Sequence, residues 1–193
     1  LYRRPEDTVY ARREKGGSNT LPTEPCGRPH TCEVTEHGLK FIVKLGYGLD
    51  TGLFLDHSLT RALVRAESPR RRVLNLFCYT GSFSVYAAAG WASEVVSVDL
   101  SAGYLQWAKE NMELNGFSGP AYRFAEQDCG SYLEEAVRAR ERFDLVILDP
   151  PSFSNSRKVE GTFNVQRDYR RYIEMIRRIL SPEGAILFST NLN

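Results

Sequence analysis

The amino-acid sequence predicts an α/β fold, with a mostly parallel, doubly wound sheet covered by helices on both faces. From residue 72 onward, short apolar runs rich in Val, Ile and Leu alternate with helical stretches. Repeated alternation of this kind is typical of βαβ units, whose crossover helices bury both faces of a parallel sheet. With 193 residues, 42% of them hydrophobic, the chain is long enough for one domain with its own core.

Three parts follow one another along the chain. The first is rich in proline, glycine and charge, and predicts a basic extended arm or linker. The second predicts a small β-hairpin, with a turn at His37 and Gly38 before an apolar strand. The third holds the alternating strands and helices. The predicted boundaries are residues 1–30, 31–54 and 55–193.

Within the third part, the predicted elements come in a regular order. The expected strands are 73–77, 94–99, 121–127, 143–149 and 184–190, and the expected helices are 55–67, 83–89, 102–114, 131–140 and 165–180. The last strand ends almost at Asn193, although parallel sheets usually protect their edges. We therefore expect the chain to be a fragment of a longer protein or to lack a closing hairpin.

Composition excludes some classes of protein. The 25 basic and 24 acidic residues nearly cancel, but the basic arm and the arginines of helix 165–180 suit a phosphate backbone as well as a solvated surface. No apolar run approaches the roughly 18 residues of a membrane span, and the N-terminus has no signal-peptide core. The sequence predicts a cytoplasmic protein without a membrane partner.

The four cysteines are spaced too irregularly for a disulfide framework, and free thiols in a reducing compartment are expected. The cluster CGRPHTC at 26–32 lacks a second ligand pair with zinc-finger spacing. We therefore predict no metal.

Polar residues stand where successive strands end, which is the edge at which open α/β sheets bind ligands. The first strand ends in a tight turn at Thr80 and Gly81 that would bring backbone N–H groups close to a ligand. The second ends at Asp99, which suits two ribose hydroxyls or the cap of the next helix. Asp128 follows the third strand and also has two interpretations: a contact to the adenine or the cap of the next helix.

The fourth strand ends in DPPSF, residues 149–153. Two prolines stop a buried strand directly after a carboxylate, which fixes the backbone there. Taken together, the four strand ends resemble the S-adenosylmethionine-dependent methyltransferases with a class I, Rossmann-like fold. The last motif resembles the Asp/Asn-Pro-Pro-aromatic motif of enzymes that methylate nucleobase nitrogens. This resemblance implies S-adenosylmethionine as cofactor and a base turned out of its stack beside Phe153.

A narrower resemblance rests on segments 49–57, 75–88, 149–156 and 163–168, which read LDTGLFLDH, NLFCYTGSFSVYAA, DPPSFSNS and FNVQRD. They resemble the C-terminal guanine-N7 half of the bifunctional bacterial 23S ribosomal RNA guanine methyltransferases. That family implies 23S ribosomal RNA, naked or pre-ribosomal, as partner, and a second N-terminal methyltransferase or RNA-binding domain outside this chain. The implied catalytic residues are Asp149, Pro150, Pro151 and Phe153. The implied cofactor-binding residues are Phe54, Asp56, Asn75, Phe77, Tyr79, Thr80, Gly81, Asp99, Leu100, Asp128, Cys129 and Asp149.

The chemistry of the candidate target atoms differs. Methylation of cytosine C5 needs a cysteine nucleophile, and Asn191 stands where the cytosine enzymes would place it. Guanine N7 has a free lone pair and no proton to lose, so alignment is the main requirement. The prediction is rRNA methylation at guanine N7. Guanine N2, the disfavoured cytosine C5, a protein amide, and an RNA-binding module with a degenerate methyltransferase fold remain alternatives.

The 154–164 stretch suits either a mobile surface loop or a lid ordered by RNA. His37 and His57 are interpreted as surface or local hydrogen-bonding groups rather than catalysts.

Overall fold

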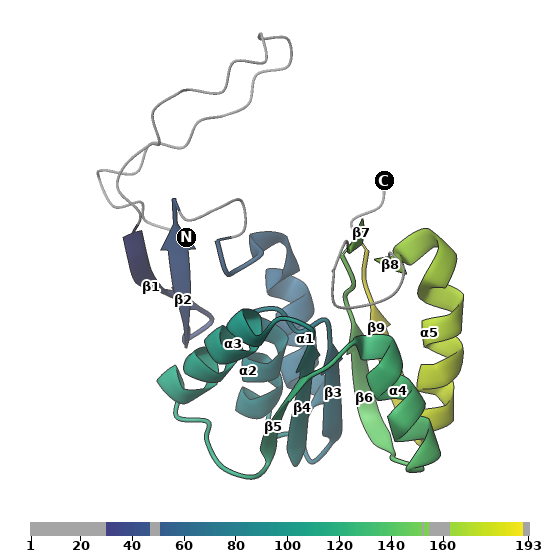
Figure 1. Ribbon diagram of the computed structural model, residues 1–193. Helices are drawn as coiled ribbons and strands as arrows, with labels where there is room; N and C mark the ends of the chain where they lie inside the picture. The colour runs from purple at the N-terminus through teal and green to yellow at the C-terminus, as the bar shows by residue number, and fades with distance from the viewer. Residues whose placement is uncertain (1–29, 47–50, 152, 155–162, 191–193) are drawn as a thin grey trace, which may run out of the picture.

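A computed structural model describes residues 30–46, 51–151, 153–154 and 163–190. Its centre is a five-stranded sheet with the strand order β5-β4-β3-β6-β9, and every neighbouring pair is parallel (Figure 1). The strands are β3 (Arg72–Leu76), β4 (Glu94–Asp99), β5 (Tyr122–Glu126), β6 (Phe143–Leu148) and β9 (Leu180–Phe188). The predicted parallel α/β sheet is confirmed.

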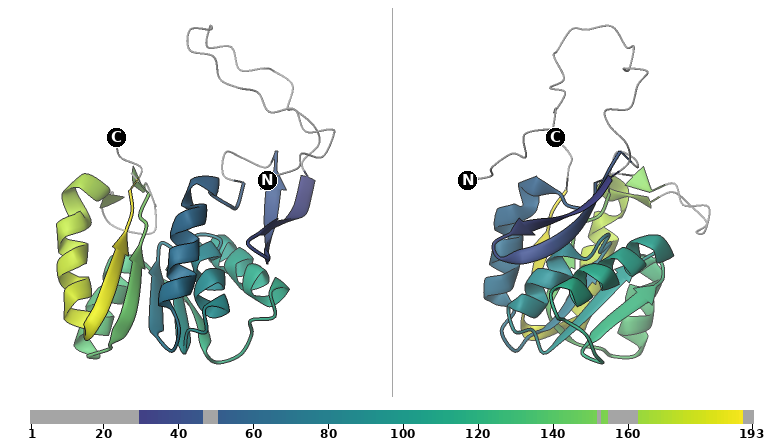
Figure 2. Two further views of the ribbon diagram at one scale, coloured as in Figure 1. Left: turned by 180° about the vertical axis from the view of Figure 1, so that it is seen from behind. Right: turned by 90° about the vertical axis from the view of Figure 1, so that its left-hand side faces the viewer.

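Helices cover both faces of the sheet, and each face has its own core (Figure 2). The helices α1 (Ser58–Glu67), α2 (Ser82–Ala89) and α3 (Ala102–Leu114) lie on one face, and α4 (Cys129–Arg138) and α5 (Val165–Ile179) on the other. Side chains alternate accordingly along β6: Ile147 joins the core under α2, and Leu148 joins the core under α4 and α5. The sheet is therefore a buried middle layer.

The strand order places a switch point at β3. The chain leaves β3 toward β4 on one side, and β6 later pairs with β3 on the other. Ligands of doubly wound sheets bind in the crevice at such a point, outside the carboxyl ends of the strands. A ligand site is therefore expected at the carboxyl ends of β3, β4 and β6.

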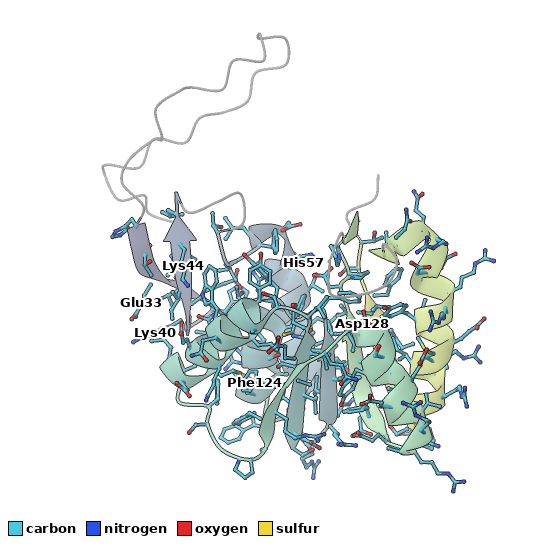
Figure 3. All side chains as sticks on the ribbon, viewed as in Figure 1. Glu33, Lys40, Lys44, His57, Phe124 and Asp128 are labelled. Atoms are coloured by element: carbon cyan, nitrogen blue, oxygen red, sulfur yellow. The ribbon has the colours of Figure 1, made fainter. Side chains whose placement is uncertain are left out.

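A separate antiparallel hairpin precedes the sheet. Strands β1 (His30–Glu36) and β2 (Leu39–Leu45) are joined by His37 and Gly38, which both have positive φ angles, 48° and 82°. Such a two-residue turn matches the natural twist of a hairpin. Phe41 is fully buried, and the Ile42 N–H donates to Asn111 Oδ1 of α3 at 2.8 Å. The hairpin is thus anchored to the helical face, with Glu33, Lys40 and Lys44 on its strands (Figure 3).

Some boundaries differ from the predictions. The helix expected from Leu55 begins as a 3₁₀ turn, η1 (Leu55–His57), before α1. β9 begins at Leu180 rather than 184, with a register irregularity over the stretch that contains Pro182 and Gly184. Proline and glycine are common at such irregularities because they lack an N–H donor or a side chain.

The long connection after β6 has paired ends. Strands β7 (Phe153–Ser154) and β8 (Phe163–Asn164) pair antiparallel, a feature that the sequence did not predict. The arm at 1–29, the stretch 155–162 and Asn191 lie outside the described residues. Among the helices that the structure describes, none is long and apolar enough to cross a membrane.

A buried ion pair ties the hairpin to α1. Arg61, whose side chain is 1% exposed, donates from Nε and Nη2 to the two carboxylate oxygens of Glu36, each at 2.8 Å. Tyr86 donates its hydroxyl to Glu36 Oε1 at 2.8 Å. Burial by itself raises the pKa of Glu36, but the hydrogen bonds from Arg61 and Tyr86 outweigh it and hold the pKa below the ordinary value.

We therefore predict an acid-sensitive stability that depends on Glu36. Because the pKa of Glu36 is lowered by folding, its contribution is present above the unfolded-state pKa of about 4.3 and is lost as the pH falls below it. Urea unfolding of the wild type and Glu36→Gln from pH 7 to 3 should show the difference between their unfolding free energies shrinking as the pH falls. A difference independent of pH would contradict this role of Glu36.

Candidate cofactor and methyl-transfer site

The turn after β3 has an unusual backbone. Phe77, Tyr79 and Gly81 have positive φ angles of 54°, 51° and 72°. Two of the three are not glycine. Non-glycine residues in the left-handed region are strained, persist only where the surrounding structure holds them, and cluster at functional sites. The Phe77 N–H donates to Cys129 Sγ at 3.2 Å, and the Tyr79 N–H donates to Asp99 Oδ2 at 2.9 Å. The turn is therefore fixed from β4 and α4.

Asp99 at the end of β4 is the acid that joins this turn to the next one. Its Oδ2 accepts from Tyr79, and its Oδ1 accepts from the Ser101 N–H at 2.9 Å. Burial raises the pKa of Asp99 even though these backbone donors favour the carboxylate. Ser101, rather than Asp99, caps α3, since its Oγ accepts from the Tyr104 N–H at 3.3 Å. Asp99 thus lies at the predicted strand end without serving as the cap.

Asp128 is the cap of α4, one of its two interpretations from sequence. Its Oδ2 accepts from the Ser131 N–H at 2.9 Å. Figure 3 places Asp128 and His57 at the same upper edge of the sheet. Asp128 therefore borders the strand-end edge while it starts the helix.

Three of the predicted cofactor residues have side chains inside the protein. Asn75 is 1% exposed, and its Nδ2 donates to Ser84 Oγ at 2.9 Å, while its Oδ1 has no partner among the described residues. Thr80 is fully buried and donates to the Gly52 carbonyl at 2.6 Å. Cys129 is 2% exposed, and burial raises the pKa of its thiol well above the ordinary value. Their side chains therefore lie beneath the strand ends and hold the neighbouring backbone in place.

An aromatic group covers the turn on its outer side. The Phe54 ring, 45% exposed, lies 5.5 Å from the Tyr79 ring, and Tyr79 meets Tyr104 edge to face at 4.6 Å. Phe54 and the exposed Asp56 come from the segment before α1, next to the Gly52 carbonyl that Thr80 binds. Leu100 is partly exposed beside Asp99. The structure therefore brings segment 51–56 to the strand ends.

Asp149 directly follows β6 and is held from two sides. Its Oδ1 accepts a short hydrogen bond from Ser189 Oγ, and its Oδ2 lies 3.6 Å from His57 Nε2. The side chains of His57 and Asp149 are 13% and 24% exposed, and the His57 ring meets Phe83 edge to face at 5.6 Å. The carboxylate is thus oriented while part of it stays accessible.

The rest of the DPPSF motif is described in part. Pro150 is buried and Pro151 is exposed, and the Phe153 backbone pairs with Asn164. The Phe153 side chain lies outside the described part of the structure.

His57 and Ser189 are the site residues that the sequence missed. The sequence predicts His57 to be a surface or local hydrogen-bonding group, whereas in the structure its Nε2 lies near the carboxylate of Asp149, 92 residues further along the chain. A usable signal was its position directly after Phe54 and Asp56, in a polar turn that precedes a helix. Ser189 follows the last strand, where a small polar residue carries little information by itself.

Gly81 allows a test of how tightly the turn is packed. A Cβ at Gly81 would lie 2.7 Å from the Ala108 Cβ, whereas a Cβ at Gly116 would meet nothing within 4 Å, although its φ is also positive at 79°. Both alanine variants suffer the left-handed strain of about 1–2 kcal/mol. Gly81→Ala should lose a further ~1–3 kcal/mol from overpacking against α3, as measured by chemical denaturation. Equal losses at the two positions would contradict tight packing.

The sheet is parallel and has a switch point, hydrogen bonds fix the turn after its first strand, and acids stand at the next strand ends. Together these features define a class I, Rossmann-like methyltransferase. The family model described as S-adenosylmethionine-dependent methyltransferase matches residues 10–193. The chain belongs to this family, and S-adenosylmethionine is its cofactor.

Relatives of known name agree with this assignment. The chain is 52% identical over 158 residues to the ribosomal RNA large subunit methyltransferase K/L of Shewanella oneidensis, a match that covers 82% of the chain and 22% of the relative. The same protein of a second Shewanella strain, ANA-3, is 51% identical over 159 residues, with the same coverage. The chain thus spans about a fifth of the length of the curated relatives it matches.

Solved structures share the fold. SMU.776, a methyltransferase complexed with SAH, superposes with a TM-score of 0.80 at 35% identity, over 86% of this chain and 43% of that one. A SAM-dependent methyltransferase from Agrobacterium tumefaciens gives 0.75 at 27% identity, over 86% of this chain and 53% of that one.

Proposed function

We propose that the chain is the catalytic part of an enzyme that methylates a nucleobase of 23S ribosomal RNA, at guanine N7. The observation that carries this proposal is the Asp149 carboxylate, held by Ser189 and approached by His57 at the strand end beside the switch point. The relatives named for large-subunit ribosomal RNA support RNA as the substrate. The proposed partner is the 23S RNA, naked or in a pre-ribosomal particle, and a second domain outside this chain would help to bind it.

The residues at the strand ends fit the family's cofactor chemically. Asp99 offers carboxylate oxygens at the position where such folds bind ribose hydroxyls. Phe54 and Tyr79 offer aromatic surface beside it, and the Asp128 carboxylate lies at the same edge. We propose these residues, together with the backbone of 77–81 and with Asp56 and Leu100, as the cofactor site. S-adenosylmethionine supplies an electrophilic methyl group on a sulfonium.

The roles proposed for the chain's own residues follow from the chemistry of N7. This nitrogen attacks through an in-plane lone pair and loses no proton, so the protein needs to align the base rather than to remove a proton. The methylated ring gains positive charge, which an oriented carboxylate stabilises. Asp149 is proposed for that role, and Pro150 and Pro151 fix the backbone that follows it. Phe153 remains the proposed aromatic contact of the base.

Cysteine chemistry offers support against cytosine C5. That reaction needs a thiolate to add to the base, and burial raises the pKa of both Cys78 and Cys129 well above the ordinary value. The sulfur of Cys129 also accepts a hydrogen bond from the Phe77 N–H. Guanine N2 and a protein amide remain competing targets, because each would use Asp149 as an acceptor for an N–H group.

The product identifies the target. The chain is incubated with an unmodified 23S RNA transcript and S-adenosylmethionine labelled in the methyl group, and the RNA is then digested to nucleosides. We expect the label in 7-methylguanosine. Label in N2-methylguanosine or 5-methylcytidine would show that another atom is methylated and that the assignment to guanine N7 is wrong. An RNA that stays unlabelled while an added protein substrate gains the label would overturn the proposed substrate.

A further inference from the structure

An aromatic pair, formed by the exposed Phe188 at the end of β9 and the half-buried Tyr169 on α5, lies outside the site described above. Phe188 is 39% exposed, and its ring is nearly parallel to that of Tyr169 on α5, with centroids 6.1 Å apart and an interplanar angle of 10°. Val165, Gln166 and Thr190 complete a hollow around the two rings. We call Tyr169 and Phe188 the aromatic shelf.

The shelf and Asp149 lie on opposite faces of the same edge of the sheet. Phe188 pairs in register with Leu148, the residue before Asp149. Leu148 belongs to the core under α4 and α5, and since side chains alternate, Asp149 points to the other face, where His57 meets it. Phe188 instead points toward α5, where it meets Tyr169. A base held at Asp149 therefore does not lie on the shelf.

An arginine lies beside the shelf. The guanidinium of the exposed Arg170 lies 5.8 Å from the centre of the Tyr169 ring, and its Nε donates to the Tyr169 hydroxyl at 3.1 Å. An aromatic face with an adjacent arginine suits single-stranded RNA, in which bases stack on the ring and the cation meets a phosphate. The exposed amide of Gln166 adds a donor and an acceptor for a base edge.

We propose that the aromatic shelf binds a nucleobase that flanks the methylated one in the RNA strand. The strand crosses the carboxyl edge of the sheet from Asp149 to α5, with the target base on the His57 side and its neighbour stacked against Phe188 and Tyr169. The inference rests on the proposed RNA substrate. It makes Phe188 and Tyr169 substrate-positioning residues that contact neither the cofactor nor the transferred methyl group.

The test is RNA binding by the chain saturated with S-adenosylhomocysteine. The probe is a fluorescein-labelled 12-nucleotide oligoadenylate, followed by anisotropy at low salt. Phe188→Ala should weaken binding by about 5- to 150-fold, the range typical for the loss of one base–aromatic stack. Tyr169→Ala should weaken it similarly, and Tyr169→Phe, which keeps the ring, should stay within about threefold of the wild type. A second oligonucleotide without bases should bind the wild type and Phe188→Ala equally.

The matched control is Trp91→Ala. Trp91 is 83% exposed and follows α2 at the opposite edge of the sheet, next to the start of β4. This variant should bind the oligoadenylate like the wild type. Thermal unfolding of each variant verifies that it is folded. Binding by folded Phe188→Ala and Tyr169→Ala within twofold of the wild type would overturn the inference, as would a wild-type chain that does not bind the oligonucleotide.

Methyl transfer to the 23S transcript, measured on the same preparations, separates this inference from the proposed function. If RNA is methylated but the shelf variants bind normally, the shelf assignment is wrong and the proposed function stands. If the shelf variants bind RNA poorly but the wild type labels protein instead of RNA, the proposed function is wrong, and the shelf is an RNA contact that does not flank a methylated base.

Discussion

Arg61→Met should destabilise the fold by about 3–5 kcal/mol, the cost of leaving one partner of a buried ion pair without the other. Arg61 is 1% exposed, binds both oxygens of Glu36, and donates from Nη1 to the Phe54 carbonyl at 2.8 Å. Removing it leaves the carboxylate of Glu36, 12% exposed, without its charged partner, although the Tyr86 hydroxyl still donates to it. Urea unfolding at pH 7 measures the loss.

The control for this prediction is Arg65→Met, one helical turn further along α1. Arg65 is exposed, and its Nη1 lies 3.5 Å from the His37 carbonyl, so the loss should stay within about 0.5 kcal/mol. The double variant Glu36→Met, Arg61→Met removes both charges and should recover part of the stability. Similar losses for Arg61→Met and Arg65→Met would show that the ion pair does not hold the hairpin against α1.

Asp99→Asn should weaken the binding of S-adenosylhomocysteine by about 10- to 150-fold, which corresponds to the ~1.5–3 kcal/mol of a hydrogen bond to a charged group. An amide in place of the carboxylate presents an NH₂ group to one of the donors at Tyr79 or Ser101. Both the ribose contact proposed for Asp99 and the position of the turn are then disturbed. Isothermal titration calorimetry on the folded variant measures the affinity.

Asp144→Asn is the matched control for Asp99→Asn. Asp144 also lies on a central strand and also accepts two hydrogen bonds, from the Arg72 N–H at 2.9 Å and the Ser181 hydroxyl at 2.6 Å. It stands near the amino end of β6, at the edge of the sheet away from the proposed site. Its variant should lose stability but keep the wild-type affinity. An unchanged affinity for Asp99→Asn would rule out the proposed cofactor contact.

The sequence predicted those features that depend on strand ends. In a parallel sheet, all carboxyl ends meet at one edge, so the strand-end residues Asp99, Asp128 and Asp149 could be assigned to one place without knowledge of the packing. The positions of the strands were predicted from their short apolar runs. The largest error is at β9, where Pro182 and Gly184 interrupt the pattern.

Contacts between distant segments could not be predicted from pattern. His57 reaches Asp149, and Arg61 reaches Glu36, only because α1 packs beside α2 and the hairpin. Arg61 is a charged residue that sequence reasoning would place at the surface. The sequence places Asn75 on a strand and Cys129 just after one, but it does not show which way their side chains point. That direction depends on the contacts of Asn75 with Ser84 and of Cys129 with the Phe77 backbone.

The central claim is that the methyl group meets the RNA base at Asp149. The most direct measurement is single-turnover transfer of labelled methyl from S-adenosylmethionine to the unmodified 23S transcript by the wild type and by Asp149→Ala, with both proteins saturated with cofactor and RNA. We predict that Asp149→Ala, under this saturation, transfers methyl at least about 100-fold more slowly than the wild type, the scale on which single transition-state contacts act. Transfer by Asp149→Ala at the wild-type rate would contradict the account.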